Sequence, residues 1–468
     1  MTARTGRRGA AVPLLVIATA QLMLVLDDSI VNIALPSIQR ELDVTAVHLP
    51  WVVNAYILAF GALLLLGGRL GDLRGRRGTL QAGIAIFVAA SLAGGFAQAT
   101  GLLVAARAVQ GLGAALAAPN ALALIATTFA DRATRDKALA LYGAMSGLGI
   151  VIGLLLGGVL ANTLGWRWVF FINVPIGLLV LLGSRALVPA DRHRGRLGAL
   201  GAVLGTGGMV ALVYAITRLG EDGFTDPVAL ILLATAGVLL AAFVAAQSRS
   251  ASPLLPLGLF RDRNRAGAYA TMLLLGVGPM GSLYVITLYL QRVQEMGPLQ
   301  TGVAWLPFAG GLVIGAGAAP KLLVRVVPRY VAAAGALLSA AAAFWFSTVT
   351  VDTTYWHLAP AMFVLGLGAG LGFLALTQAA VYRVDPGKAG IASALLNSSQ
   401  QVGVALGLAV LAAVAAATTA APANAALRSG EALVAGYSSA LTVAAGMLAA
   451  AGVLAAATLS GRPGGDAP

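Results

Sequence analysis

Three charged residues stand inside long apolar stretches of the sequence, and their positions make them the first candidates for chemistry. Asp27 and Asp28 lie in the stretch 12–35, and Arg107 lies in the stretch 102–129. An ionisable side chain costs at least ~2.5 kcal/mol at the centre of a bilayer, so its presence in a membrane span predicts a function. Burial favours the neutral form of a carboxylic acid, whereas a nearby cation favours the anion. A buried carboxylate beside an arginine can therefore bind and release a proton as its surroundings change.

The apolar stretches themselves have the length and composition of membrane spans. Of the 468 residues, 59% are apolar and 10% are charged, a composition that excludes an ordinary soluble protein. About 20 apolar residues cross ~30 Å of hydrocarbon as a helix, which satisfies its own backbone there. The sequence therefore predicts an all-α polytopic membrane protein. Its fourteen transmembrane helices are expected at 12–35, 50–68, 80–99, 102–129, 138–164, 168–184, 197–217, 227–247, 266–291, 299–320, 330–351, 357–382, 389–417 and 436–458.

The distribution of positive charge tests this count of helices. Lys and Arg concentrate on the cytoplasmic side of bacterial membrane proteins. Twenty-four of the 30 Lys and Arg residues fall in the N-terminus, the even-numbered loops and the C-terminus, and only five fall in the odd-numbered loops. A missed or invented helix would destroy this asymmetry. We therefore predict a multi-pass protein of the bacterial cytoplasmic (inner) membrane with both termini in the cytoplasm.

Other classes of function have little support in the sequence. The net charge of +13 is dispersed over short loops, which indicates membrane orientation and no nucleic-acid partner. The chain has no Cys, and its three His residues are far apart, so we expect no metal, no other cofactor and no enzyme site. No phosphate-binding loop of the Gly-x4-Gly-Lys-Ser/Thr type occurs, which excludes an ATP-driven pump and leaves an ion gradient as the energy source for any active process.

Short motifs recur between the two halves of the chain. Gly68, Asp72 and Arg76 are matched 249 residues later by Gly317, Lys321 and Arg325. The string Gly-Leu-Gly-Ala at 111–114 returns at 366–369, and Lys-Ala at 137–138 returns at 388–389. Helix n therefore corresponds to helix n+8, which predicts six helices, two extra helices and a second six. Such repeats imply a pseudo-twofold axis along the membrane normal and alternating access to a central cavity.

Four longer strings carry a resemblance to a known family. They are LDDSIVNIALP at 26–36, GGRLGDLRGRRG at 67–78, RAVQGLGAA at 107–115 and WRWVFFINVPIG at 166–177. Together they resemble the fourteen-spanner drug/proton antiporter family of the major facilitator superfamily, in particular actinobacterial multidrug or antibiotic exporters. The resemblance implies a major facilitator fold with six-helix bundles at 1–190 and 261–468, joined by two linking helices at 191–260.

The same resemblance implies a function in multidrug efflux and antibiotic resistance. A monomer would export small amphipathic compounds from the cytoplasm in exchange for protons. The alternative is a proton-coupled importer, or an exporter of one specific metabolite, with the same fold. The family's fifth-helix motif also has Gly-Pro before Gly-Gly, whereas here Gly153 is followed by Leu154. Gly149, Gly153, Gly157 and Gly158 remain, and their spacing predicts close helix packing without a proline kink.

The family pattern assigns roles to the charged residues. Asp27 fills its fixed acidic position and Asp28 a variable one, so Asp27 is the expected proton carrier and Arg107 its partner. A static ion pair between helices one and four is the alternative for Asp27. Asp28, Asn32 and Gln110 are candidates for the substrate cavity, although packing would also explain them.

Two further groups complete the candidate residues. Aromatic and amide side chains deep in helices nine, ten and twelve are candidates for the substrate cavity, namely Tyr284, Trp305, Phe308, Phe373 and Gln378. The loop after helix two is expected to form a cytoplasmic latch, with candidate members Gly68, Asp72, Arg76, Arg132 and Arg135. Trp166 and Trp168 fall at the beginning of helix six, where we interpret them as anchors at the membrane surface.

Overall fold

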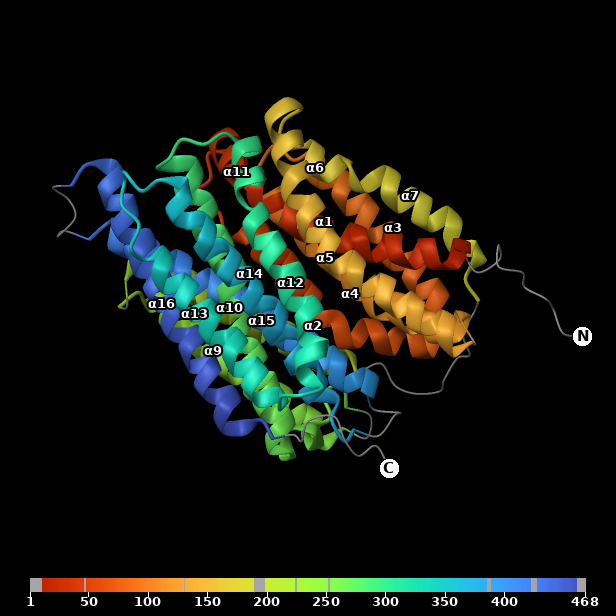
Figure 1. The fold of residues 1–468 in the computed structure, drawn as a ribbon. Coiled ribbons are helices and arrows are strands. Elements are labelled where there is room, and N and C mark those ends of the chain that lie inside the picture. The colour runs from red at the N-terminus through yellow and green to blue at the C-terminus, as the bar shows by residue number, and fades with distance from the viewer. Residues whose placement is uncertain are drawn as a thin grey trace, which may run out of the picture. The chain divides into compact units, whose positions relative to one another are not determined.

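The computed structural model is helical throughout the part of the chain that it describes, and no β-strand occurs there (Figure 1). It describes residues 11–45, 48–129, 131–188, 198–223, 225–250, 253–384, 389–421 and 427–460. The N-terminal helices are α1 (Ala11–Leu42), α2 (Trp51–Arg74), α3 (Arg76–Gly95), α4 (Thr100–Thr128), α5 (Arg132–Thr163), α6 (Trp168–Phe171) and α7 (Asn173–Gly183), followed by the short η1 (Ser184–Ala186). The later helices are α8 (Ala199–Asp222), α9 (Pro227–Arg249), η2 (Leu257–Arg261), α10 (Arg263–Arg292), α11 (Pro298–Ala304), α12 (Leu306–Leu323), α13 (Pro328–Phe346), α14 (Tyr355–Val381), α15 (Ala389–Thr419) and α16 (Ser429–Thr458).

Within those described residues, fourteen helical segments are long and apolar enough to cross a membrane, which confirms the predicted count. Two of the spans contain a break. The sixth runs through α6 and α7, and the tenth runs through α11 and α12. Pro175 and Pro307 stand within the first turns after these breaks and lack the backbone N–H that would continue the helical ladder. The two interruptions therefore follow from local sequence.

The chain divides into two compact units, each considered by itself. The N-terminal unit contains α1 to α7, and the C-terminal unit contains α9 to α16 together with most of α8. In the first, α4 packs on α2 and α3, and α1 packs on α5. In the second, α14 packs on α12 and α13, and α10 packs on α15. The internal repeat predicted from the sequence is thus confirmed as the same packing pattern within each unit.

Glycines at matching positions show how close this repeated packing is. A Cβ atom on Gly111 would lie 2.3 Å from the Tyr56 carbonyl oxygen, and one on Gly366 would lie 2.0 Å from that of Phe308. Both distances are far below van der Waals contact, so only glycine allows these backbones to approach. Small residues at helix contacts are the usual means of close packing in membranes.

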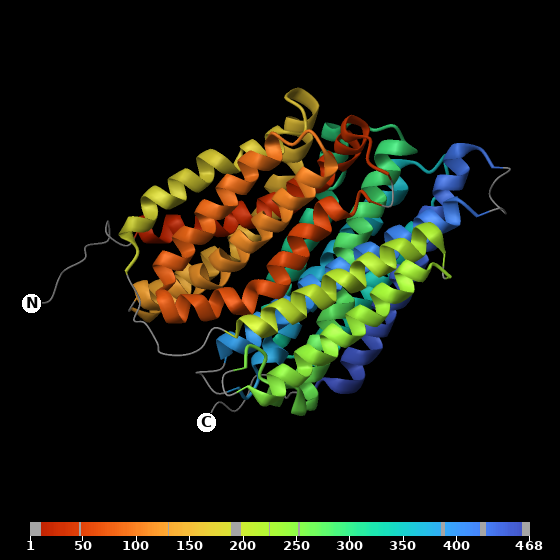
Figure 2. The same ribbon diagram turned by 180° about the vertical axis from the view of Figure 1, so that it is seen from behind.

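The two linking helices, α8 and α9, form a pair in the C-terminal unit (Figure 2). Gly205 and Gly208 of α8 face Phe243 and Leu240 of α9, and α9 is the least buried span in the part of the chain that the structure describes.

Asp226 caps the N-terminus of α9 by accepting hydrogen bonds from the backbone N–H groups at 228 and 229.

Candidate functional site

Asp27 and Arg107 form a fully buried ion pair between α1 and α4. Arg107 Nη1 donates to Asp27 Oδ2 at 2.6 Å, and both side chains have 0% exposure. Gln110, one helical turn after Arg107, accepts from the same Nη1 at 3.1 Å. The Gln110 amide also donates to Asp27 Oδ1 at 3.2 Å and to Ser91 Oγ of α3 at 2.6 Å. The structure therefore contains the expected ion pair between Asp27 and Arg107, and Gln110 bonds the guanidinium as expected.

The second helix holds the arginine from another direction. Arg107 Nε donates to the Val52 carbonyl oxygen at 2.9 Å, and its guanidinium lies 4.4 Å from the centre of the Tyr56 ring. Val52 and Tyr56 are four residues apart and share one face of α2. A desolvated cation over an aromatic face gains ~2 kcal/mol or more. The guanidinium is thus positioned by α1, α2 and α4 together.

Asn173 completes the cluster, and the sequence analysis missed it. Its Nδ2 donates to Asp27 Oδ1 at 2.7 Å, with the residue fully buried at the first position of α7. The available signal was its place in the string at 166–177, which carried the family resemblance without a role for this residue. Asp27 therefore accepts three hydrogen bonds in the structure, from α4 and α7.

Asp28 has a different environment from Asp27, although the two are adjacent. Its side chain is half-buried, and its Oδ1 is enclosed without a hydrogen-bond partner among the described residues. Asn32 is buried and donates to the Asp28 backbone carbonyl oxygen at 2.9 Å, so this amide group supports α1 itself. Of the acidic pair, Asp28 alone retains an unused acceptor inside the protein within the described part of the chain.

The fifth-helix glycines lie against α1. Cβ atoms on Gly149 and Gly157 would approach Val25 and Ile30 to below 3.0 Å, and one on Gly153 would lie 1.9 Å from Ser29 Oγ. Gly158 is also buried. The helix runs without a break from Arg132 to Thr163 and contains no proline. Because the proline is absent, α5 is continuous. Its glycines allow it to pack closely on α1, the helix that carries Asp27.

The candidate cavity residues of the C-terminal unit separate into two groups. Tyr284, Trp305 and Phe308 are buried in the unit. Trp305 donates to Thr287 Oγ1 at 3.1 Å and packs edge-on against Phe308. These are packing contacts within the unit. Phe373 and Gln378 of α14 are exposed and stay candidates for substrate contact.

In the candidate latch, Asp72 in the last turn of α2 pairs with Arg76, the first residue of α3, at 3.0 Å, and both side chains are partly exposed. The expected loop after helix two is reduced to Gly75, because α2 continues to Arg74. Gly68 faces Pro119 of α4 at ordinary contact distance. Arg135 lies in the first turn of α5. The side chain of Arg132 lies outside the described residues. The latch stays a prediction.

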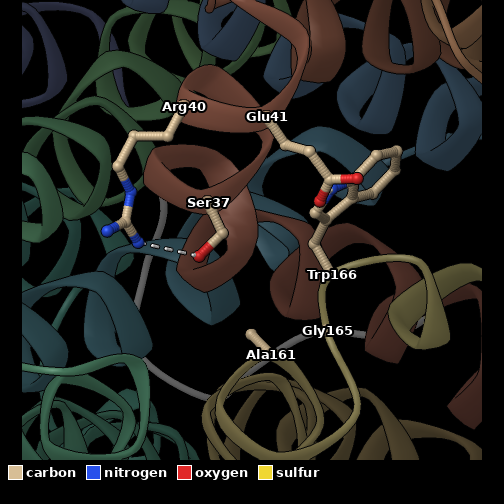
Figure 3. Close-up of a pocket in the computed structure, with 6 residues that line it drawn as sticks. All are labelled: Ser37, Arg40, Glu41, Ala161, Gly165 and Trp166. Carbon is tan, nitrogen blue, oxygen red and sulfur yellow. Dashed lines mark hydrogen bonds between the residues drawn. The ribbon is translucent and has the colours of Figure 1, made fainter.

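A shallow pocket of about 350 Å³ lies where α1 and α5 end (Figure 3). Its lining residues are Ser37, Arg40, Glu41, Ala161, Gly165 and Trp166. Glu41 accepts a hydrogen bond from Trp166 Nε1 at 2.7 Å and pairs with Arg167, which also donates to the Ala97 carbonyl oxygen at 3.2 Å. These contacts join the ends of α1 and α3 to the segment before α6.

Trp166 is only 1% exposed, so its interpretation as a surface anchor was wrong. Trp168 is 45% exposed, as an anchor requires. Position at a span end does not distinguish the two residues, because the end of α1 covers Trp166 and leaves Trp168 exposed.

Membrane helices that enclose an ion pair, on a scaffold that repeats the same packing in two units, are typical of membrane transporters. The sequence matches the family described as Major Facilitator Superfamily over residues 17–408. The chain belongs to this superfamily.

Similar proteins include several with names that refer to antibiotics. The chain is 45% identical to the puromycin resistance protein pur8 of Streptomyces alboniger, over 87% of this chain and 82% of that protein. It is 39% identical to the cephamycin export protein CmcT of Amycolatopsis lactamdurans, over 89% and 88%. Among solved structures, a peptide transporter POT is similar with a TM-score of 0.68 at 14% identity, covering 94% of this chain and 93% of that one. At that identity the likeness shows the fold alone.

Proposed function

We propose that this protein is a proton-coupled antiporter that exports small amphipathic compounds, drugs or antibiotics, from the cytoplasm by alternating access. Membership of the superfamily and similarity to proteins named for puromycin resistance and cephamycin export support the export of such compounds. The observation that carries proton coupling is the Asp27–Arg107 pair, a carboxylate and a cation fully enclosed among membrane helices.

The contacts of Asp27 suggest how a proton acts on this cluster. The ionised carboxylate accepts from Arg107, Gln110 and Asn173, so it joins α1 to α4 and α7. Protonation removes the negative charge, weakens the charge-assisted bond to Arg107 and frees these helices to shift. A proton bound on one side and released on the other therefore couples its gradient to the change in access.

The remaining features of the proposal follow from charge and packing. The concentration of Lys and Arg in alternate loops supports a bacterial inner-membrane protein with both termini in the cytoplasm. The functional halves are the six-helix bundles at 1–190 and 261–468, with the segment 191–260 as a peripheral link, and the protein acts as a monomer. Protons and amphipathic molecules are the transported species, and the segment from Gly68 to Arg76, where α2 ends and α3 begins, acts as the cytoplasmic latch.

Drug-induced proton movement in proteoliposomes tests the function. Purified protein is reconstituted with a pH-sensitive dye inside, and puromycin or ethidium is added with and without an imposed pH gradient. We expect proton movement opposite to that of the drug, and accumulation that collapses with an uncoupler. Uptake in the same direction as the proton would instead support the importer, and transport of none of a broad drug panel would support one specific metabolite.

A further inference from the structure

We propose that Asp27 and Asp28 share one exchangeable proton, and that Arg107 pairs with whichever of the two carboxylates is ionised. In the state described here Arg107 pairs with Asp27, and the proton is on Asp28. This inference rests on the proton-coupled export proposed above and assigns a role to an acidic residue that the family pattern leaves variable.

Unused hydrogen-bonding atoms on Arg107 and Asp28 are the first observation. Arg107 uses Nη1 and Nε, but its buried Nη2 has no partner within the described part of the chain. Asp28 Oδ1 is likewise enclosed without a partner there. One group is a donor and the other an acceptor, so the two are complementary. A buried carboxylate oxygen without a donor is costly when ionised, which favours the neutral acid at Asp28 in this arrangement.

Proximity is the second observation. Asp27 and Asp28 are consecutive on α1, so their side chains leave the helix about 100° apart. The carboxyl group of Asp28 lies within electrostatic range of both Arg107 and Asp27. A rotation of the long arginine side chain, or a small rotation of α1, can therefore transfer the ion pair from one carboxylate to the other.

The surroundings of Asp28 contain few other titratable groups. Tyr56 of α2 lies in the same electrostatic neighbourhood as the two carboxylates and Arg107. No charged residue occurs in α6 or α7, which also pack on α1, whereas η1 packs on α1 and contributes Arg185. On α5, the charged side chains that the structure describes, Arg135 and Lys137, lie in its first two turns.

Charge balance explains why an exchange would be favourable. Arg107 keeps its proton under all physiological conditions, so a buried arginine needs an anionic partner at every step. With one proton on two carboxylates, the cluster of three residues is neutral in either arrangement. When the proton moves from Asp28 to Asp27, the ion pair moves from Asp27 to Asp28. Loss of the proton leaves one net negative charge, which a cationic substrate can balance.

Infrared difference spectroscopy of the reconstituted full-length protein tests the exchange directly. The C=O stretch of a protonated carboxyl group should be present in the wild type at neutral pH and should disappear in Asp28→Asn. The informative variant is Asp27→Asn, in which Asp28 is intact. Because Arg107 must then pair with Asp28, the band should also be absent. Asp222→Asn, which changes an exposed carboxylate far along the chain, is the control and should retain the band.

Proton release provides the second measurement. Asp28→Asn replaces the neutral acid by a neutral amide, so folding and the binding of an uncharged drug should be retained while drug-induced proton release is lost. A carboxyl band that persists in Asp27→Asn, or is absent from the wild type, would overturn the exchange. So would wild-type proton release by Asp28→Asn, or a loss confined to binding of the cation tetraphenylphosphonium, which would make Asp28 a substrate contact. Absence of proton release from the wild type itself would instead overturn the proposed function.

Discussion

Asn173 on α7 donates a 2.7 Å hydrogen bond to Asp27 on α1, across 146 residues of sequence. Gln110 of α4 donates to the same carboxylate oxygen, and Arg107 pairs with the other one. Asp27 is thus the point at which three helices of the N-terminal unit meet. Removal of its charge should therefore affect all three helices, which gives the first prediction.

Asp27→Asn should still bind a neutral amphipathic drug but lose accumulation driven by a proton gradient. The amide imitates the protonated acid and cannot release a proton. Drug counterflow, which needs no net proton movement, should survive. The measurement is paired drug and proton flux in proteoliposomes. Gradient-driven export at the wild-type rate would eliminate Asp27 as a coupling residue.

Arg107→Gln should destabilise the protein and move the pH optimum of transport upward. Removal of one member of a buried pair leaves the other uncompensated, at a cost of about 3–5 kcal/mol. Loss of the nearby positive charge favours the neutral form of a buried carboxyl group, so proton release should need a higher pH. The double variant Asp27→Asn with Arg107→Gln should recover part of the lost stability, measured by denaturation in detergent. Strictly additive losses would mean that the two residues are not coupled.

Gly153→Leu should disrupt the contact between α1 and α5. Its side chain would have to enter space occupied by Ser29 and by the Leu26 carbonyl oxygen. Overpacking of this kind costs about 1–3 kcal/mol. Gly147 is the matched control, because a Cβ atom added there would have no atom of the described structure within 4 Å, apart from its own helix backbone. We expect Gly147→Leu to keep its thermal stability and transport, and equal losses in both variants would argue against close packing as the role of Gly153.

Trp166→Ala and Trp168→Ala should differ sharply, although the two residues are close in sequence. Trp166 is buried and hydrogen-bonded to Glu41, so its truncation should cost about 3–5 kcal/mol. Trp168 is exposed and its loss should change stability little. Thermal unfolding of both variants in the same detergent provides the comparison. Equal effects would restore the interpretation of both as surface anchors.

The loop between α8 and α9 should lose stability in acid. The Arg218 guanidinium, which bonds Asp226 at 2.7 Å, holds the pKa of that carboxyl below its usual value, and backbone N–H groups of α9 act in the same direction. A carboxyl with a lowered folded pKa contributes stability above its unfolded pKa of about 3.9, and this stability is lost as the pH falls through the folded pKa. Hydrogen exchange at the start of α9 should therefore accelerate only in strong acid. Asp226→Asn should remove that acid-dependent step, while an unchanged profile would contradict the assignment.

Much of the fold follows from the sequence because membrane spans obey a local rule. Each helix must satisfy its own backbone in the bilayer, so length and hydrophobicity identify the spans one at a time. Repeated motifs then predicted the correspondence between halves, which the packing of α4 and α14 confirmed. Asp27 and Arg107 could be singled out for the same local reason, since a charge is rare in an apolar span.

The rest depends on how the helices turn toward one another, which no local pattern encodes. Asn173 resembles any polar residue at the start of a helix until the packing of α7 on α1 brings it to Asp27. Trp166 and Trp168 have the same local character, yet only one is covered by the end of α1. Asp27 and Asp28 are chemically identical neighbours, and only the rotation of α1 about its axis gives one an arginine and leaves the other with an unused oxygen. The sequence by itself determined which residue types enter the membrane, whereas tertiary packing determined which of them meet, because a hydrogen bond depends on position and direction in space.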